Sequence, residues 1–533
     1  MAVTLSNLGE PEWTEKAKKS GLDPLGMQTS GIALYQELVP GISNVTLRMR
    51  YYGFYAWLAR SYAQQVGDTG LERWLIFLRR AEALYALVAA RAGGESGIGG
   101  IEWAERALAT PDDFVIFHDA TDREEGHPQY LQGKFGSYGQ AYGSQLIEVG
   151  VLFVGGKVHK VPVPTKVLGE NLASAFTSAI GAAGPEFLVA VGVGEVSKAQ
   201  LDAWKSMRPS AIQVDSSEWQ AYIELLFTPN APQGSRAEAR NLSLRLTLHV
   251  ASRRPALVKV DTVRWQLYAE QFGFETGAVP ALSEREQAHR FKWAAYHAND
   301  LLHVCYETVL KLCLDILSAA PNQRLPLDRL VNRAVEWLQD SLSEQAPATW
   351  REFCDGIGPA QNPSNSADTA SDCGLANSAL QAGRPGASAS EYALRGALTL
   401  LAVLHRRLGG LVEQIASTCS VLASAGHIRS LVTELPFLEA HADEPLRDLL
   451  ARIVKQRVLD RHLWVATQKF RGTTRDYTFL FEPDDGHVRF RAADGPILTN
   501  PRLAQGIAFL TDLQLLGSAG PTAAGLAILG EAA

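Results

Sequence analysis

The chain has 533 residues, of which 46% are hydrophobic and 20% are charged, and its net charge is −7. This composition is typical of a folded globular protein, and the length exceeds what one hydrophobic core usually supports. The negative net charge excludes a surface that is basic all round, but it permits local basic patches.

Residues 1–110 are predicted to form a mainly helical N-terminal domain. Leu71 to Arg91 is rich in Leu, Ala, Arg and Glu, and Gly93-Gly94 ends the pattern. Upstream, Arg48 to Trp57 interleaves arginines with aromatic residues, a composition that suits stacking on nucleic-acid bases. The helical spacing of the apolar residues favours a core face instead, made by Tyr51, Phe54, Tyr55 and Leu58.

Residues 111–190 are predicted to contain a winged-helix-like unit, which is a helix, a hairpin and a second helix in chain order. Gly136 to Val149 has apolar residues at helical spacing. Two β-branched runs, 151–154 and 158–161, flank a Gly-Gly pair, and a tight hairpin turn needs positive φ at both central positions. Leu168 to Ile180 restarts a helix.

Residues 191–355 are predicted to be mainly helical. Ser283 and Glu286 have the spacing of a capping box, which indicates a long helix from Glu284 to about Leu317. Leu242 to Val250 alternates apolar and polar residues like a half-buried strand, but its spacing also suits a helix, and the sequence leaves both open.

Residues 356–388 are crowded with Gly, Ser, Asn, Ala and Pro, which predicts a flexible linker or an exposed loop. A helical segment over 389–443 follows. A second winged-helix-like unit is expected over 444–533, where an apolar helical stripe precedes two strands around an Asp-Gly turn. The predicted fold is therefore mainly α, a helical multidomain protein with two helix–hairpin–helix units.

Two groups of residues are candidate nucleic-acid contacts, because cationic side chains neutralise phosphates and polar ones reach base edges. The first group belongs to the 111–190 unit: Lys134, Gln140, Lys157, His159 and Lys160. The second group crowds the C-terminal unit: Arg452, Lys455, Arg457, Arg461, Lys469, Arg471 and Arg475. The alternatives are a winged helix used only for packing or dimerisation, and a solvated helix face.

No residue pattern indicates a catalytic site, a metal or a cofactor. His289, His297 and His303 fall on one predicted helix, but none has the i, i+4 spacing of a metal pair. The five cysteines are odd in number and form no C-x-x-C pair, which argues against disulfides and zinc ribbons. With no signal-peptide pattern, and no apolar run that could span a bilayer, we expect a cytoplasmic protein.

The segment Pro40 to Trp57 resembles one near the start of uncharacterised proteins encoded in bacterial antiviral defence islands, with Thr46, Arg48, Arg50 and Tyr51 matching its pattern. The resemblance implies a bacterial antiviral defence complex as the setting. Together with the two hairpin signals and the local basic bias, it predicts a non-catalytic DNA-binding or scaffolding subunit of such a complex, with DNA and a helicase, nuclease or ATPase as partners. One alternative is a kleisin-like architectural partner of an SMC-type ATPase, because helical chains with winged-helix ends suit such a bridge. Another is a nuclease with a dispersed active site.

Overall fold

The computed structural model describes residues 23–122, 129–156, 159–228, 231–253, 258–274, 282–342, 347–359, 361–424, 427–470 and 478–530. This chain divides into two compact units. Unit 1 comprises Met1–Leu34, Tyr268–Phe274 and Phe291–Thr499, and unit 2 comprises Tyr35–Leu267, Glu275–Arg290 and Asn500–Ala533. Three helices contain residues of both units: α1 (Gln28–Leu38), α12 (Val260–Gln271) and α13 (Glu284–Ser318).

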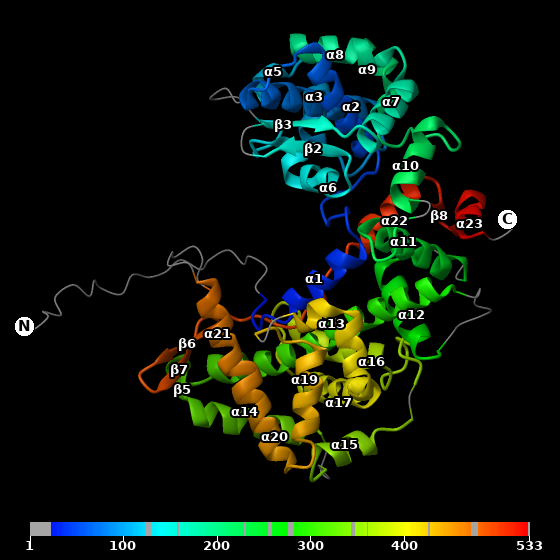
Figure 1. Ribbon diagram of the computed structural model, residues 1–533. Coiled ribbons are helices and arrows are strands. Elements are labelled where there is room, and N and C mark those ends of the chain that lie inside the picture. Colours follow the sequence, from blue (N-terminus) through cyan, green and yellow to red (C-terminus); the bar gives the residue numbers. More distant parts are fainter. Residues whose placement is uncertain are drawn as a thin grey trace, which may run out of the picture. The chain divides into compact units, whose positions relative to one another are not determined.

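Unit 2 is mainly helical, and α2 contacts both α3 and α7 (Figure 1). A π-helical turn, Tyr138–Tyr142, precedes α6. The other helices are α2 (Tyr51–Gln65), α3 (Leu71–Ala92), α4 (Ile101–Leu108), α5 (His118–Thr121), α6 (Gly143–Glu148), α7 (Leu168–Ile180), α8 (Ala183–Val193), α9 (Lys198–Ala203), α10 (Ser217–Phe227), α11 (Arg236–Ser252), α22 (Leu503–Asp512) and α23 (Ala523–Leu529).

The strands of unit 2 form three antiparallel pairs. Strand β2 (Leu152–Gly155) pairs with β3 (His159–Pro164). The other pairs are β1 (Phe114–Ile116) with β4 (Glu195–Ser197), and β8 (Leu516–Gly517) with β9 (Gly520–Pro521).

The core of unit 2 is rich in aromatic residues. Tyr51 stacks on Tyr142 with ring centroids 4.6 Å apart, and Phe54 stacks on Tyr85 at 4.3 Å. All four rings are buried, so the core-face interpretation of Tyr51 and Phe54 is confirmed. Stacked and edge-on pairs of this kind add to the energy of apolar burial.

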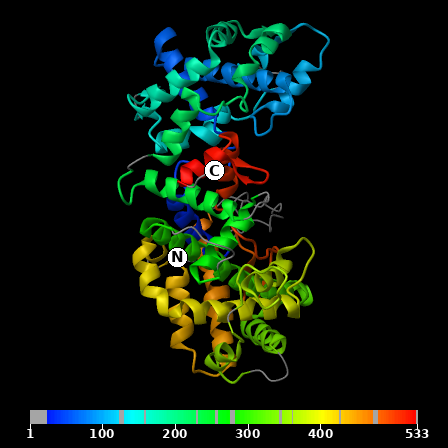
Figure 2. The same ribbon diagram turned by 90° about the vertical axis from the view of Figure 1, so that its right-hand side faces the viewer.

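In unit 1, helix α17 contacts α14, α15, α16 and α19. Helix α20, a π-helical segment over Ile453–Leu459 and α21 follow one another without a break, in orange in Figures 1 and 2. The helices are α14 (Leu327–Ser341), α15 (Trp350–Gly356), α16 (Asp372–Leu380), α17 (Glu391–Leu408), α18 (Val412–Thr418), α19 (Leu431–Ala440), α20 (Leu446–Arg452) and α21 (Asp460–Lys469). One antiparallel sheet has the strand order β5 (Arg324–Pro326), β7 (His487–Phe490), β6 (Phe481–Asp484).

The mainly helical fold predicted from the sequence is confirmed. The structure differs from the linker expected over 356–388. A helix, α16, lies within this range, and most residues of that helix are buried. The predicted C-terminal unit over 444–533 is divided, since residues up to Thr499 belong to unit 1 and the rest belong to unit 2. In the part of the chain that the structure describes, no single helix is long and apolar enough to cross a membrane, although α7 and α8, bent by 98° to each other, pass that test as a pair.

Candidate functional site

The β2–β3 hairpin of unit 2 exposes apolar side chains on one face. Phe153 and Val163 are cross-strand partners, with 58% and 40% of their surfaces exposed. Leu152, the neighbour of Phe153, is buried because successive strand residues point to opposite faces. One face of the hairpin therefore packs on unit 2, and the other presents apolar groups to solvent.

The exposed apolar surface continues past the end of β3. Val167 is 78% exposed and Leu168 is 36% exposed. Leu168 Cδ1 lies 3.8 Å from where a β-carbon on Gly150 would stand, which places Leu168 beside the start of the hairpin. We call the residues Phe153, Val163, Val167 and Leu168 the hairpin face. Exposed apolar groups that gather in one region of a protein typically mark binding surfaces.

The charges beside the hairpin face are unbalanced. Lys160 and Lys166 are exposed, and neither forms an ion pair or hydrogen bond with the residues that the structure describes. The acids of the flanking helices are engaged: Glu148 binds Arg236 at 2.7 Å, and Glu170 lies 3.6 Å from Arg60. The surroundings of the hairpin face are therefore locally positive.

The candidate nucleic-acid residues of this region have different surroundings. Lys134 forms an ion pair with Glu72 at 2.9 Å, so its charge is matched within the chain. Gln140 is exposed on the π-helical turn, and Lys160 is exposed on β3. His159 begins β3, and Lys157 lies outside the described residues.

Two of the seven C-terminal candidates are engaged by other groups of unit 1. Arg452 pairs with Glu444 at 2.9 Å, and the Lys469 ammonium donates to the Asp23 carbonyl at 2.7 Å. Lys455 is exposed. Arg457 and Arg461 are considered below, and Arg471 and Arg475 lie outside the described residues.

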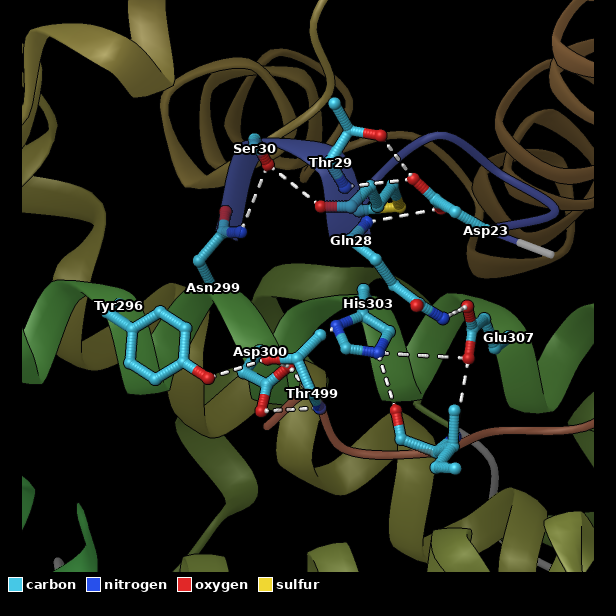
Figure 3. Close-up of polar contacts among 12 residues, drawn as sticks. Asp23, Gln28, Thr29, Ser30, Tyr296, Asn299, Asp300, His303, Glu307 and Thr499 are labelled. Atoms are coloured by element: carbon cyan, nitrogen blue, oxygen red, sulfur yellow. Dashed lines mark hydrogen bonds and ion pairs between the residues drawn. The ribbon is translucent and has the colours of Figure 1, made fainter. Parts of the chain in front are cut away.

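Helix α13 carries a buried polar cluster in unit 1 (Figure 3). His303 Nδ1 lies 3.2 Å from Asp300 Oδ1, and His303 Nε2 lies 3.8 Å from Glu307 Oε2. All three side chains are at most 2% exposed. Burial lowers the pKa of His303, but Glu307 and Asp300 outweigh it and raise that pKa to about 9. The imidazole is thus held as a cation.

This cluster fastens two other segments of unit 1 to α13. Gln28 Nε2 donates to Glu307 Oε1 at 2.8 Å, and the Thr499 hydroxyl donates to Asp300 Oδ1 at 2.8 Å (Figure 3). His303 Nε2 contacts the carbonyl of Ile497 at 2.7 Å. With such complete burial, the cluster has a structural function.

A pocket of about 660 Å³ in unit 1 contains Cys354, His405 and Glu439. Cys354 Sγ lies 3.9 Å from His405 Nδ1, and His405 Nε2 lies 3.3 Å from Glu439 Oε2. Burial raises the pKa of Cys354 to about 12 and lowers the pKa of His405. The Trp350 indole donates to His405 Nδ1 at 3.1 Å, so this nitrogen is already occupied. The thiol is therefore not activated as a nucleophile.

Sequence patterns missed this pocket because its three polar groups come from three helices, with no local motif. No group of three His, Cys, Asp or Glu residues within the described ranges is placed to hold a metal ion. In comparisons with protein-family models, curated proteins and solved structures, nothing matches this chain.

Proposed function

We propose that the chain is a non-catalytic scaffolding subunit that binds a protein partner through the hairpin face. The observation that carries this proposal is the exposure of Phe153, Val163 and Val167 on and beside one ribbon. Aromatic and aliphatic side chains that lose their water on binding supply most of the energy at protein interfaces. The winged-helix-like interpretation of the helix–hairpin–helix order is part of the same proposal.

A protein partner suits this surface better than a nucleic acid. Phosphate backbones are bound by cationic groups, whereas the hairpin face is apolar. Some cations expected to contact DNA, among them Lys134 and Arg452, already form ion pairs with carboxylates of the chain. Because Lys160 and Lys166 leave the surroundings positive, the partner segment would combine apolar residues with acidic ones.

The test is a charge placed on the hairpin face. Phe153→Asp should weaken binding of the partner, identified among the products of neighbouring genes, by about 30-fold, the loss expected at an interface hot spot. Val189→Asp, which changes a 67% exposed residue on α8, is the matched control and should bind normally. Circular dichroism should show both variants folded. Unchanged affinity of the folded Phe153→Asp variant would disprove the docking role.

DNA binding by the same hairpin is a second candidate, favoured by the unpaired, exposed Lys160 and Lys166. Duplex affinity should then fall steeply with salt, and changing both lysines to Gln should reduce the logarithmic salt slope by about 2. A duplex affinity that does not respond to salt, or no binding, would count against this candidate.

The cellular setting that we propose is a bacterial antiviral defence complex. The support is the resemblance of Pro40 to Trp57, whose Arg48 and Arg50 form ion pairs with Asp512 and Glu218 in unit 2. Arginines that are ion-paired in this way maintain the fold and take no part in a reaction. If the proposal holds, cells that express the Phe153→Asp variant should lose protection against phage in a plaque assay, while Val189→Asp should retain it.

A further inference from the structure

Three arginines of unit 1 surround a single buried carboxylate. Arg457 Nε lies 3.5 Å from Glu434 Oε2, and Arg429 Nε lies 3.9 Å from Glu434 Oε1. Both separations exceed a hydrogen bond, and Glu434 is only 1% exposed. The third member, Arg461, follows Arg457 by one helical turn. We call Arg429, Arg457 and Arg461 the arginine cluster.

Arg461 is only 7% exposed, yet no carboxylate of the described residues lies within hydrogen-bond reach of its guanidinium. Its Nε donates to the Leu25 carbonyl at 2.7 Å, and its guanidinium lies 4.5 Å from the Trp464 ring. Its two terminal nitrogens donate to no residue that the structure describes, and neither is fully buried. Burial, followed by the charge of Arg429, lowers the pKa of Arg461 to about 10.

The acids facing the arginine cluster do not balance it. Besides Glu434, Asp23 contributes a negative charge near Arg461. Figure 3 shows that the Asp23 carboxylate is occupied by the N-terminus of α1, where it accepts hydrogen bonds from the Thr29 amide and hydroxyl. The Lys469 ammonium, which donates to the Asp23 carbonyl, adds a further positive charge. The four cations thus outnumber the two acids.

We propose that the arginine cluster is a binding site for a phosphate group. A desolvated cation without a matched anion is costly, and a bound oxyanion would remove this cost. Arginine's planar fork matches phosphate oxygens at two points, and the unpaired terminal nitrogens of Arg461 offer that fork. This site lies in unit 1 and does not depend on the docking function proposed for unit 2.

Arg457 and Arg429 have distinct contributions to such a site. Arg457 packs its guanidinium 3.8 Å from the Phe437 ring centroid, which fixes its orientation. Arg429 is the most accessible member, with 30% of its side chain exposed. We therefore expect Arg429 to close on the ligand and Arg457 to supply a fixed charge. Glu434 opposes an anion, so it limits the affinity.

The experiment is calorimetric titration of the full chain at low ionic strength with inorganic phosphate, with adenosine monophosphate and with a short DNA duplex. Arg429→Gln should weaken binding of inorganic phosphate about tenfold, the loss of one charge-assisted hydrogen bond. Glu434→Gln should strengthen it severalfold, because the competing charge is removed. Arg447→Gln on α20, which removes a cation outside the arginine cluster, should leave the affinity unchanged.

The three ligands distinguish the source of the phosphate. Equal affinity for inorganic phosphate and the nucleotide assigns the site to a free phosphate, and tighter nucleotide binding assigns it to a nucleotide. Binding of the duplex alone would reflect general charge attraction and would overturn the proposal. So would wild-type affinity in the Arg429→Gln variant, or an absence of saturable phosphate binding by the wild-type chain.

Discussion

Arg50 and Glu218 form a two-point ion pair inside unit 2, with Arg50 Nε 2.8 Å from Oε1 and Nη2 3.0 Å from Oε2. Their side chains are 1% and 2% exposed. Arg50 Nη1 also donates to the carbonyls of Ser206 and Arg208, both at 2.6 Å. One arginine of the Pro40 to Trp57 segment thus joins α2 to α10 and to the loop before it.

Removing the charge of Glu218 should destabilise unit 2 strongly. In Glu218→Gln, the buried guanidinium loses its counter-ion, and the expected cost is about 3–5 kcal/mol of unfolding free energy. Glu224→Gln, which changes an exposed residue of the same helix, should cost less than about 0.5 kcal/mol. Guanidinium denaturation followed by tryptophan fluorescence measures both. Similar unfolding midpoints for the two variants would contradict this account of the ion pair.

Glu82 on α3 is the second buried charge that organises unit 2. Its two oxygens accept hydrogen bonds from the hydroxyls of Tyr55 and Tyr130 and from the amides of Ser137 and Tyr138, at 2.5–2.8 Å. Burial raises the pKa of Glu82, although these four donors oppose the shift. The carboxylate therefore joins α3 to the turn that precedes the π-helix.

Glu82→Gln should destabilise the chain although it is nearly isosteric. An amide nitrogen cannot accept, so it would face two donors, and each buried group left without a partner costs about 1–3 kcal/mol. Glu72→Gln, at an exposed site on the same helix, is the control. Thermal unfolding should show a clear decrease for Glu82→Gln alone. Equal melting temperatures would mean that the four donors find other partners.

Asp372 shows why composition misjudged residues 356–388. Its carboxylate binds both terminal nitrogens of Arg407 and accepts from the Tyr268 hydroxyl at 2.9 Å. Small residues let α16 pack closely on α17, since a β-carbon at Gly396 of α17 would lie 2.7 Å from Ser378 of α16. Gly and Ala are common both in loops and at close helix contacts, so composition alone could not distinguish the two.

Asp372→Asn should weaken this attachment. Because α16 is buried in the wild type, thermolysin should cut residues 372–380 slowly. In Asp372→Asn, Arg407 loses its charge partner. A loss of about 1.4 kcal/mol in the free energy that holds α16 in place corresponds to a factor of ten, so thermolysin should cut this helix at least about tenfold faster. Asp368→Asn, in the exposed turn before α16, is the control. Fast cutting of the wild type within α16 would restore the linker interpretation.

Local patterns predicted the helices well, but they do not show which residues distant along the chain come together. The capping box of Ser283 and Glu286 forms, with the Glu286 amide donating to Ser283 Oγ at 3.3 Å and the Ser283 amide donating to Glu286 Oε2 at 2.9 Å, and α13 ends one residue past the predicted Leu317. Leu242 to Val250 lies within the helix α11, where tertiary packing decided between two periodicities that the sequence allowed. The arginine cluster joins residues 429 and 461, and no spacing rule along the chain predicts such a contact.

The α13 cluster should make unit 1 less stable at alkaline pH. Interaction with Glu307 and Asp300 raises the pKa of His303 to about 9, above its ordinary value near 6.5. Its contribution is complete below pH 6.5 and is lost as the pH rises through 9. Burial raises the pKa of Glu307 to about 8. The folded chain therefore binds this proton more tightly than the unfolded chain does, and the stability linked to the proton is complete below the ordinary pKa of Glu and lost as the pH rises to 8.

Both groups therefore act in the same direction, and Glu307→Gln should reduce both contributions. Glutamine keeps an oxygen that can accept from Gln28, but it has no proton to lose and no charge to raise the pKa of His303. Only the part of the His303 contribution that Asp300 supports should remain. Urea unfolding at pH 5, 7 and 9 should give a free energy that falls less steeply with pH in Glu307→Gln than in the wild type. A Glu336→Gln variant, at an exposed site on α14 of unit 1, should keep the wild-type slope. Parallel pH profiles for Glu307→Gln and the wild type would contradict this account, because they would show that Glu307 neither binds a proton on folding nor raises the pKa of His303.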